Sequence, residues 1–468
     1  MSLRIYNSLT KKKEEFVPLN GKTVNIYTCG VTVYDECHIG HARSLYIFDV
    51  IRRYLIFRGY KVHFVRNITD VDDKIIHKAN ELKKTSEAVA KVNIDSYNKD
   101  LKRLHIATAD KEPKATDNIP DMVKHIDGLI KKDLAYTVDG DVYFSVRKFE
   151  GYGKLSGQSI EKMQEAVRIE KDEKKKDPLD FALWKKSKDN EPAWESPWGK
   201  GRPGWHIECS AMSMKHLKCQ TLDIHAGGRD LIFPHHENEI AQSEGLTEKL
   251  FAKYWIHHGL LTINGQKMAK SLGNFITISD LLLKFSADDL KMFFLFSHYA
   301  SPVDYSDEKM EDAHKALDRI DVLFWKASEI VKKATTKEIA KPAFLEKAQN
   351  IFLEAMDDDF NTPKALSAIF DLVSDINKFI DQNTKDKHYA DIICAAIDTI
   401  EGCMTGIFGL FAEEMPTELG QEEERLIKER EDARKNKDFK KSDQIRDLLR
   451  ERGVVVEDTK DGQAWRWM

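Results

Sequence analysis

Residues 29–41 constrain the fold more than any other stretch, because a β-rich run at residues 23–27 precedes them and an apolar helical pattern follows them. This order predicts a strand, a loop and a helix. Within the loop, Gly40 lies between His38 and His41. A glycine at such a junction lets a ligand approach the backbone closely, while the imidazoles and the N–H groups of the helix N-terminus face it. Phosphate is the predicted ligand, although two histidines that only cap a helix would give the same short pattern.

A second phosphate-binding pattern lies far downstream, at residues 267–271, where the chain reads Lys-Met-Ala-Lys-Ser. It follows a strand-like run at residues 260–263 and lies in a loop bounded by glycines. The two lysines and the hydroxyl, from Lys267, Lys270 and Ser271, match the negative charge of a phosphate under attack. The two patterns together are far more specific than either one alone.

The combination of His-Ile-Gly-His with Lys-Met-x-Lys-Ser resembles the class I aminoacyl-tRNA synthetases, whose two signature motifs bind ATP. Four surrounding segments narrow the resemblance to the cysteinyl-tRNA synthetase family, and the similarity runs from about residue 21 to the C-terminus. One position departs from the family pattern, since Ala269 stands where serine is usual. The change removes one hydroxyl and retains both lysines. The four segments are residues 29–35, 66–74, 204–210 and 233–239.

Alternating strand and helix patterns predict an α/β fold. Strand-like runs at residues 24–28 and 61–66 alternate with helical periodicity at residues 42–59 and 72–105. This alternation is typical of a parallel sheet with crossover helices. Ligands of such sheets bind at the carboxyl ends of the strands, so the loops after both strands are expected at the binding edge.

The resemblance implies a Rossmann-like parallel-sheet catalytic domain with an inserted connective domain, followed by an α-helical bundle and a small C-terminal domain. Helical patterns at residues 278–299, 307–333 and 342–382 agree with the bundle. The expected boundaries are residues 1–115 and 196–265 for the split nucleotide-binding catalytic domain, 116–195 for the connective insertion, 266–315 for the Lys-Met-Ala-Lys-Ser loop and stem-contact region, 316–412 for the helical anticodon-arm bundle, and 416–468 for the C-terminal anticodon-binding domain.

Composition narrows the class of protein. The 468 residues exceed what one hydrophobic core usually serves, so about two to four domains are expected. A net charge of −5 provides no overall positive field that would attract a polyanion, so any nucleic acid must be held by local basic patches.

No apolar run approaches the ~20 residues of a membrane span, and the N-terminus lacks the apolar core of a signal peptide. Six cysteines without a disulfide-framework spacing indicate thiols or metal ligands. We also expect a cytoplasmic monomer that does not contact a membrane.

Four residues form a candidate metal site: Cys29, Cys209, His235 and Glu239. His235 and Glu239 are four positions apart after a proline, so a helix that starts there would present both on one face. Two thiolates, an imidazole and a carboxylate suit Zn²⁺. Spacing alone leaves an alternative, in which the cysteines are small buried apolar residues and the histidine run is a polar helix start, because the set contains no Cys-x-x-Cys pair. The resemblance implies that all four positions are ligands of one zinc ion per chain.

A zinc ion would give amino-acid selectivity a physical cause. Serine differs from cysteine by one atom, and shape alone separates near-isosteres by only ~10 to 200-fold. Zinc prefers a thiolate to a neutral hydroxyl and lowers the pKa of the thiol, so the metal would recognise cysteine by binding its sulfur directly. No editing domain would then be required. The sequence allows cysteine either to add a fifth ligand or to displace Glu239.

Three further residues are candidates for substrate contacts around Cys29. Trp205 could form a wall of the side-chain pocket, Thr69 could hydrogen-bond the substrate, and Asp230 could hold a ribose hydroxyl or the substrate amine. Core packing, helix capping or an ordinary turn explains these residues equally well. Five other histidines are alternative ligands or phosphate contacts, which rank below His235 because the resemblance does not place them on zinc. They are His206, His225, His236, His257 and His258.

The resemblance also implies the reaction. The carboxylate of L-cysteine attacks the α-phosphate of ATP, which is accompanied by Mg²⁺, and releases pyrophosphate; the cysteinyl group then passes to the terminal ribose of tRNA(Cys). No covalent enzyme intermediate is required, so catalysis is mainly positioning and charge stabilisation. The histidines would steady the phosphates, the glycine would permit the nucleotide to approach, and the two lysines would close over the leaving pyrophosphate. The residues assigned to ATP and catalysis are His38, Gly40, His41, Lys267, Lys270 and Ser271.

The C-terminal residues, from about 416, are expected to recognise the anticodon. Phe439 lies at a turn where its ring could stack on an unpaired base, which contributes ~1 to 3 kcal/mol per base. The alternative is a charged, solvated helical hairpin with Phe439 as its small core. Lys440 and Arg446 are further candidates for tRNA contacts. The predicted basic surface consists of Arg434, Lys435, Lys437, Lys440, Lys441 and Arg446.

Two other functions stay open at this point. A cysteine ligase of the mycothiol pathway resembles the same catalytic core but would lack the anticodon-binding tail, whereas residues 433–443 and 445–448 resemble the C-terminal domain of the synthetase. A zinc-stabilised RNA-binding protein without catalysis would need neither ATP pattern, and both patterns are intact.

Overall fold

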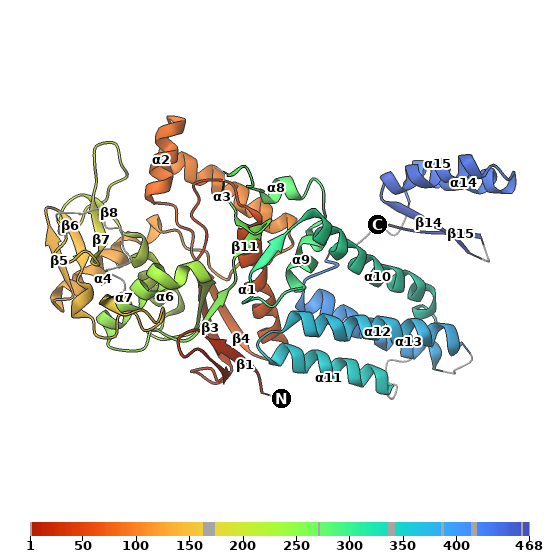
Figure 1. The fold of residues 1–468 in the computed structure, drawn as a ribbon, viewed down its shortest axis with the longest axis horizontal. Coiled ribbons are helices and arrows are strands. Elements are labelled where there is room, and N and C mark those ends of the chain that lie inside the picture. Colours follow the sequence, from red (N-terminus) through yellow and green to blue (C-terminus); the bar gives the residue numbers. More distant parts are fainter. Residues whose placement is uncertain are drawn as a thin grey trace. The chain divides into compact units, whose positions relative to one another are not determined.

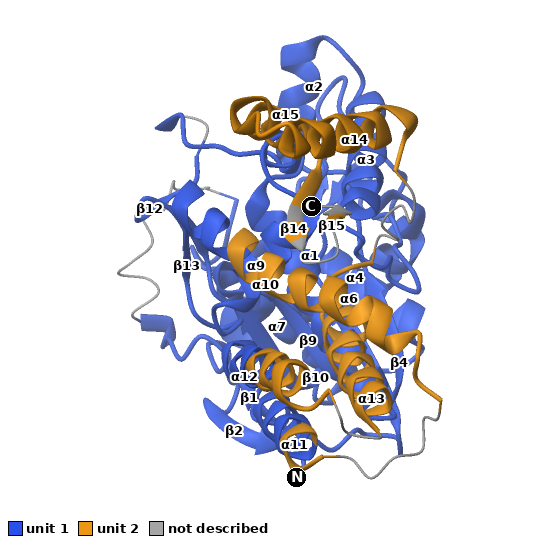
Figure 2. Cartoon of the chain, turned by 90° about the vertical axis from the view of Figure 1, so that its right-hand side faces the viewer, with its two compact units in different colours: residues 1–313, 346–371 blue, residues 314–345, 372–468 orange. Residues whose placement is uncertain are grey.

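The computed structural model describes residues 2–161, 174–269, 272–335, 342–384, 388–412, 419–459 and 462–467. The predicted ATP contacts Lys270 and Ser271 lie outside these described residues. The chain divides into two compact units (Figure 2), the first formed by Met1–Ala313 with Glu346–Asp371 and the second by His314–Leu345 with Leu372–Met468.

A parallel sheet of order β10–β9–β3–β4 is the main sheet of the first unit. Figure 1 labels its strands β3 and β4. Its strands are buried along most of their length, as is usual for parallel sheets. Helix α1 (Ile39–Phe57) connects the first two strands as a crossover. This sheet confirms the α/β fold that the alternating patterns predict. The strands are β3 (Thr23–Thr28), β4 (Lys61–Arg66), β9 (Leu222–Gly228) and β10 (Ala252–His258).

The helical pattern predicted over residues 72–105 is divided into two helices, α2 (Asp73–Leu82) and α3 (Ser86–Arg103). Lys83 ends α2 in the left-handed region, at φ 52°, and the Thr85 side chain caps α3. Apolar periodicity continues across this break, so periodicity alone does not reveal it.

A second, antiparallel sheet of order β5–β6–β7–β8 is inserted between β4 and β9. Its first two strands form the β5–β6 hairpin, which turns at Gly140 with φ 92°. Phe144 and Trp184 of this sheet belong to the same buried cluster as Cys209, so the insertion packs on the helices that flank the main sheet. The elements of this region are α4 (Ile119–Lys131), β5 (Ala135–Val138), β6 (Asp141–Phe144), β7 (Phe181–Lys186), β8 (Gly201–Pro203), α6 (Trp205–Leu217) and α7 (Glu237–Thr247).

A small sheet of order β12–β11–β13 carries the start of the second ATP pattern, since Lys267 is the last residue of β12. β11 pairs antiparallel with β12 and parallel with β13. The helical pattern predicted over residues 278–299 is interrupted before Ser286, whose side chain caps α9. The elements here are β11 (Leu261–Ile263), β12 (Gln266–Lys267), α8 (Ile278–Leu281), α9 (Ala287–Leu295) and β13 (Val303–Tyr305), and an N-terminal hairpin is formed by β1 (Arg4–Asn7) and β2 (Lys12–Glu15).

Long helices follow the small sheet: α10 (Asp307–Val331), α11 (Ala343–Asp357), α12 (Thr362–Gln382) and α13 (Tyr389–Glu401). The pattern predicted over residues 342–382 is broken by a turn in which Asp359 and Phe360 are left-handed, at φ 65° and 53°. The Asp359 carboxylate accepts from the Tyr6 N–H and the Tyr299 hydroxyl, each at 2.8 Å, so tertiary hydrogen bonds within the first unit stabilise the turn. Across the described ranges, no helix is both long enough and apolar enough to cross a bilayer.

The C-terminal part of the second unit is a helical hairpin with a two-stranded sheet: α14 (Gln421–Lys435), α15 (Phe439–Glu451), β14 (Val454–Thr459) and β15 (Gly462–Trp467). Its small buried core, the tail core, comprises Leu426, Ile445, Leu449, Val454 and Val456. Arg430 is also buried, and its guanidinium pairs with the Asp458 carboxylate at 3.0 Å.

Replacing Leu449 with alanine is expected to destabilise the tail by about 2 to 5 kcal/mol, because a fully buried leucine is lost and a cavity remains. Leu448 is a matched control, since it is the adjacent leucine and is 40% exposed. Amide hydrogen exchange at residues 454–456 should accelerate in Leu449→Ala and change little in Leu448→Ala. Equal exchange in both variants would show that the tail core does not stabilise β14.

Candidate active site and metal centre

His38 and His41 lie at the start of α1, where each caps the main chain of the other. The His41 N–H donates to His38 Nδ1 at 3.2 Å, and the His38 N–H donates to His41 Nδ1 at 3.3 Å. Because Nδ1 is the acceptor in both neutral rings, each ring carries its proton on Nε2. The rings stack with their centroids 3.7 Å apart. Capping therefore prepares two imidazole N–H donors, and the capping and phosphate-binding interpretations are compatible.

Burial lowers the pKa of His38 to about 4 and the pKa of His41 well below its usual value. The His38 ring and the Lys74 ammonium lower the pKa of His41 further. Both rings are neutral at pH 7 and act as hydrogen-bond donors rather than as cations. Positive charge for a bound phosphate would have to come from other residues, and Lys267 is the exposed lysine that the structure describes in the second motif.

The two motifs that are predicted to bind ATP lie side by side in the first unit. A Cβ on Gly40 would lie 2.9 Å from the His38 ring and 3.5 Å from the methyl group of Met268. The Ile39 N–H also donates to the Ile276 carbonyl, at 3.1 Å, beyond the end of the second motif. Gly40 is thus required by the packing of the motif itself, in addition to the room it leaves for a ligand.

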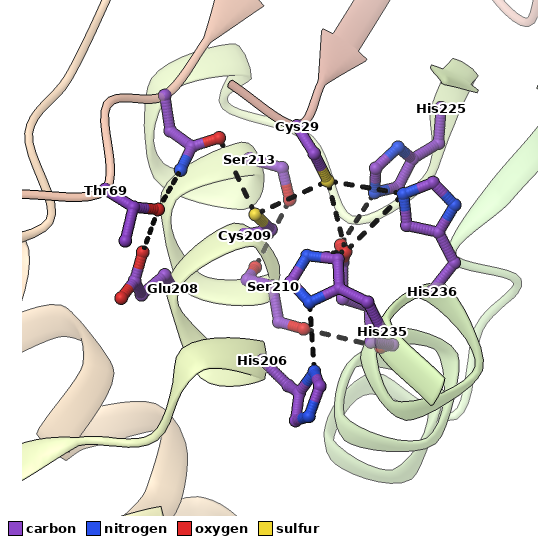
Figure 3. Close-up of polar contacts among 12 residues, drawn as sticks. Cys29, Thr69, His206, Glu208, Cys209, Ser210, Ser213, His225, His235 and His236 are labelled. Atoms are coloured by element: carbon purple, nitrogen blue, oxygen red, sulfur yellow. Dashed lines mark hydrogen bonds and ion pairs between the residues drawn. The ribbon is translucent and has the colours of Figure 1, made fainter. Parts of the chain in front are cut away.

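Two thiols, an imidazole and a carboxylate meet at the carboxyl edge of the main sheet (Figure 3). Cys29 directly follows β3, Cys209 lies on α6, His235 belongs to the π-helical turn η4 (Ile232–His236), and Glu239 lies on α7. Glu239 Oε1 is 3.0 Å from His235 Nε2 and 3.4 Å from Cys29 Sγ, and the two sulfurs are 3.6 Å apart. All four donor atoms lie within 4.8 Å of one another. The structure therefore brings together the four residues that the family resemblance implies as metal ligands.

A second set of donors shares two members with the first: Cys29, His225, His236 and Glu239. His225 Nε2 is 2.6 Å from Glu239 Oε2, and His236 Nε2 is 3.3 Å from Cys29 Sγ. His257 holds the other side of the His236 ring, with 2.8 Å between the two nitrogens. Because Cys29 and Glu239 belong to both sets, the sets are alternatives for a single ion. In the sequence analysis His225 and His236 rank below His235 as metal ligands. The sequence does contain one signal for His225, which lies near the end of a strand at the binding edge.

The two thiols of the site differ in pKa. Burial raises the pKa of Cys29 well above its usual value, and the neighbouring Cys209 adds to this effect. At Cys209 burial is outweighed by the hydrogen bond from the Cys29 thiol and by His235, so that its pKa falls to about 6. One thiolate and one thiol therefore share the site at pH 7. A cation bound between them would hold both as thiolates.

Glu239 is fully buried among imidazoles. Burial opposes its ionisation, yet His225 and His235 hold the pKa of the Glu239 carboxyl well below its usual value. Burial likewise opposes the protonation of His235, but Glu239 and Cys209 raise the pKa of this imidazole to about 10. His235 must lose that proton before its nitrogen can bind a metal. A buried group of anionic donors that is neutralised by an imidazolium provides a suitable setting for a dication.

The predicted substrate contact Thr69 is buried and bonded within the protein. Its hydroxyl donates to Glu208 Oε2 at 2.8 Å and accepts from Asn67 Nδ2 at 3.2 Å. Asn67 Oδ1 in turn accepts from the Gly30 N–H at 2.9 Å. Glu208 is a residue that sequence reasoning missed, although it immediately precedes Cys209. Burial raises the pKa of its carboxyl well above the usual value, and its Oε1 has no hydrogen-bond partner within the described structure.

Trp205 and Asp230 lie at the same edge of the main sheet. The Trp205 indole stacks on the His235 ring, with 4.1 Å between the ring centroids, and remains 37% exposed. Asp230 is exposed in the short turn η3 (Arg229–Leu231), which directly follows β9. Its carboxylate lies against Gly228, where a Cβ would collide with it. Trp205 thus covers a predicted metal ligand, and the Asp230 carboxylate is open to solvent.

Phe439 is the first residue of α15 and is 57% exposed. The tail core is formed by other side chains, so the interpretation of Phe439 as the core of the hairpin is wrong. Lys440 is exposed beside it. Arg434 and Arg446 form ion pairs with nearby aspartates, at 2.8 Å and 3.2 Å, so part of the predicted basic surface already has intramolecular partners.

Three family models match consecutive parts of the chain. They are the class I (C) tRNA synthetase catalytic domain over residues 15–315, the DALR domain over residues 351–412, and the cysteinyl-tRNA ligase anticodon binding domain over residues 417–466. A cysteine–tRNA ligase from Persephonella marina is 49% identical, with 100% of both chains covered. Another from Aquifex aeolicus is 48% identical, with 100% of this chain and 99% of that protein covered. The chain belongs to the cysteine–tRNA ligase family. The predicted resemblance and the assignment as a class I ligase are confirmed.

Solved structures of distant relatives share the fold of this cysteine–tRNA ligase family member. Methionyl-tRNA synthetase of Mycobacterium tuberculosis, in complex with methionyl-adenylate, superposes with a TM-score of 0.65 at 16% identity and covers 83% of this chain and 92% of that one. LeuRS of Agrobacterium radiobacter K84, in a ternary complex with tRNA and LeuAMS, gives 0.62 at 12% identity, with 84% and 85% covered. Family membership implies ATP-dependent activity with tRNA and an amino acid as partners. The full-length match, which includes the anticodon-binding domain, excludes the mycothiol-pathway ligase and the non-catalytic RNA-binding protein.

The His38 imidazole is expected to stay neutral down to about pH 4, because burial lowers its pKa from 6.5 to about 4. Between these pH values the unfolded chain binds a proton at His38 that the folded chain does not, so this residue makes the folded state less stable as the pH falls. The pH dependence of the imidazole resonances, assigned with His38→Gln, measures the pKa directly. A value near 6.5 would contradict the buried ring described above.

Proposed function

We propose that this ligase activates L-cysteine with Mg²⁺-ATP to cysteinyl adenylate and transfers the cysteinyl group to the 3′ end of tRNA(Cys), with one zinc ion per chain selecting the thiol. The observation that carries the proposal is the convergence of Cys29, Cys209, His235 and Glu239 at the carboxyl edge of the main sheet. That edge is where open α/β sheets bind their substrates.

The donor chemistry of this set fits zinc. Two sulfurs, an imidazole nitrogen and a carboxylate oxygen form a suitable four-ligand set, of which only Cys29 is partly exposed, so the site is accessible from that side. His235 is oriented by its neighbours: its Nδ1 lies 2.9 Å from His206 Nδ1, and Trp205 stacks on its ring. Such supporting contacts fix the direction of a ligating nitrogen. When bound, zinc would supply a Lewis acid that takes the substrate sulfur as a thiolate.

Discrimination against serine is the central problem for such an enzyme. A pocket that relies on shape would separate the two amino acids by only ~10 to 200-fold, whereas a thiolate-binding metal rejects the neutral hydroxyl on chemical grounds. In this assignment Trp205 forms a wall of the side-chain pocket beside Cys29, and Asp230 binds the substrate ammonium or a ribose hydroxyl. Thr69 contributes indirectly, because its hydroxyl holds Glu208 in place at 2.8 Å.

For ATP, we assign the phosphates to the Nε2–H groups of His38 and His41, beside Gly40. The loop that begins at Lys267, and continues through Lys270 and Ser271, is assigned to the leaving pyrophosphate. Catalysis then rests on positioning and on charge stabilisation as the cysteine carboxylate attacks the α-phosphate.

Alanine at position 269 is compatible with a working loop. The Ala269 N–H donates to Asn274 Oδ1 at 2.8 Å, and Asn274 Nδ2 donates to the Lys267 carbonyl at 3.3 Å. The main chain of residue 269, and not a side-chain hydroxyl, thus makes the contact that closes this loop.

We assign anticodon recognition to the C-terminal domain, with Phe439 as a stacking platform and Lys440 and Arg446 as phosphate or base contacts. The exposure of Phe439, 57%, supports this role, because an aromatic ring outside the tail core is available to an unpaired base. We further propose that the enzyme works as a cytoplasmic monomer, with the domain boundaries expected from the sequence.

Purified wild-type protein is expected to contain one zinc ion per chain, and Cys209→Ser to lose it, because a neutral hydroxyl is a much poorer ligand than a thiolate. Cys219→Ser is the matched control, since this cysteine lies outside both candidate ligand sets. Elemental analysis measures the metal, and pyrophosphate exchange with cysteine or serine measures selectivity, which should fall in Cys209→Ser alone. Equal zinc in the two variants would overturn the ligand assignment.

Phe439→Ala is expected to raise the KM for tRNA(Cys) and leave cysteine-dependent pyrophosphate exchange unchanged, because stacking contributes ~1 to 3 kcal/mol per base. Leu448→Ala is the matched control: this exposed residue lies nine positions further along α15, on the opposite side of the helix. Aminoacylation kinetics at varied tRNA concentration provide the measurement. Equal KM values in the two variants would remove Phe439 from the tRNA interface.

A further inference from the structure

Arg43 lies two residues after His41 on α1, and it is buried, with 1% of its surface exposed. Its guanidinium donates to four main-chain carbonyl oxygens. The acceptors are Gly259 and Leu260, at 2.7 and 2.9 Å from Nη1, and Tyr299 and Ser301, at 3.2 and 2.5 Å from Nη2. One side chain thus binds two chain segments that are distant from α1 in sequence.

The four acceptors lie at the entrance to the small sheet that carries Lys267. Gly259 and Leu260 form the link between β10 and β11, and Tyr299 and Ser301 precede β13. β11 and β13 are parallel, with Leu261 paired to Val303, so their N-terminal ends lie at the same edge of the sheet. β11 also pairs with β12, which places Thr262 opposite Lys267. Arg43 therefore holds the edge from which the Lys267 loop extends.

The chemistry at this junction requires an arginine. A guanidinium presents five N–H groups in one plane and can bridge several oxygens, whereas an ammonium is a compact point charge. Burial lowers the pKa of Arg43 to about 10, so the group stays cationic at pH 7 and makes charge-assisted bonds. The two segments approach closely because residue 259 is a glycine, since a Cβ there would collide with the Ser301 carbonyl.

The far end of the same loop is also attached to the start of α1. The Ile39 N–H donates to the Ile276 carbonyl at 3.1 Å, and the Ile278 N–H donates to the Cys37 carbonyl at 2.9 Å. The main chain makes this second attachment, which is independent of side-chain identity. Arg43 is therefore a side chain through which a substitution can change the position of the loop relative to the two histidines.

We propose that Arg43 is a positioning residue for adenylate formation, which sets the distance between the Lys267 loop and the imidazoles of His38 and His41. This inference rests on the proposed roles of these three residues toward ATP. A misplacement of about 1 Å in a catalytic group can cost ~100-fold in rate. An anchor that defines this distance should affect the ATP half of the reaction and leave cysteine binding unchanged.

The test compares Arg43→Lys with Arg52→Lys. Arg52 lies on the same helix and also bonds a carbonyl and a carboxylate, those of Thr108 and Asp110, away from the loop. Arg43→Lys is expected to slow pre-steady-state adenylation about 10 to 100-fold and to raise the KM for ATP. Zinc content and the Kd for labelled cysteine should stay within about 2-fold of wild type, and Arg52→Lys should resemble wild type throughout.

A double-mutant cycle with Lys267→Ala distinguishes an effect of Arg43 on the position of the loop from an effect on the fold as a whole. If Arg43 acts through the loop, the effect of Arg43→Lys should shrink when Lys267 is already absent. Gly259→Ala, which separates the two segments and leaves the arginine at position 43 in place, should reproduce the Arg43→Lys kinetics and provides the test if Arg43→Lys does not fold.

Each remaining outcome overturns the inference. If Lys267→Ala slows adenylation but the Arg43→Lys factor is the same in both backgrounds, Arg43 does not position the loop, and the role of Lys267 stands. If Lys267→Ala has no effect, the proposed role of the loop fails and the inference fails with it. Loss of zinc or cysteine affinity in Arg43→Lys, as large as the loss in adenylation rate, would make Arg43 a general structural residue.

Discussion

Parallel pairing of β3 with β4 on one side and β9 on the other determines where chemistry can occur in this protein. Thr28, the last residue of β3, is opposite both Arg66 and Ala226, so the three strands end at nearly the same level. Cys29 and the segment after Arg66 leave the sheet there, and helices α6 and α7 add Cys209 and Glu239 from the side. Residues far apart in sequence meet because the register of the sheet aligns the ends of its strands.

The charges of the candidate metal site depend on one another. An isolated carboxylate or thiolate is costly in a buried site, because water no longer solvates it. Glu239 is nevertheless ionised, since His225 and His235 surround it, and Cys209 is a thiolate because Cys29 and His235 bond to it. Burial therefore strengthens the interactions among these groups.

Helix α1 links the two motifs that we propose to bind ATP. Its first turn carries the capped histidines, and Arg43 on the next turn binds the segments that lead to the small sheet. Tyr299 extends this connection, because its carbonyl accepts from Arg43 while its hydroxyl donates to Asp359 in the turn before α12. Within the first unit, hydrogen bonds thus connect helix α1 with the segments before β11 and β13 and with the turn at Asp359.

The sequence by itself determined the local elements and the chemistry they could carry. The spacing of apolar residues and the local composition predict β3, β4 and α1, because such elements depend on residues that are close in sequence. The motif at residues 38–41 predicts an anion site at a helix start. The metal set needed the family resemblance, because spacing does not show that Cys29 and Cys209 meet. Only the tertiary structure decided the helix breaks at Lys83 and Asp359, the bonding of Thr69 to Glu208, the exposure of Phe439 and the unequal pKa values of the two thiols. Each of these depends on which distant groups a residue is buried against, and burial is a property of the packed chain that local sequence does not contain.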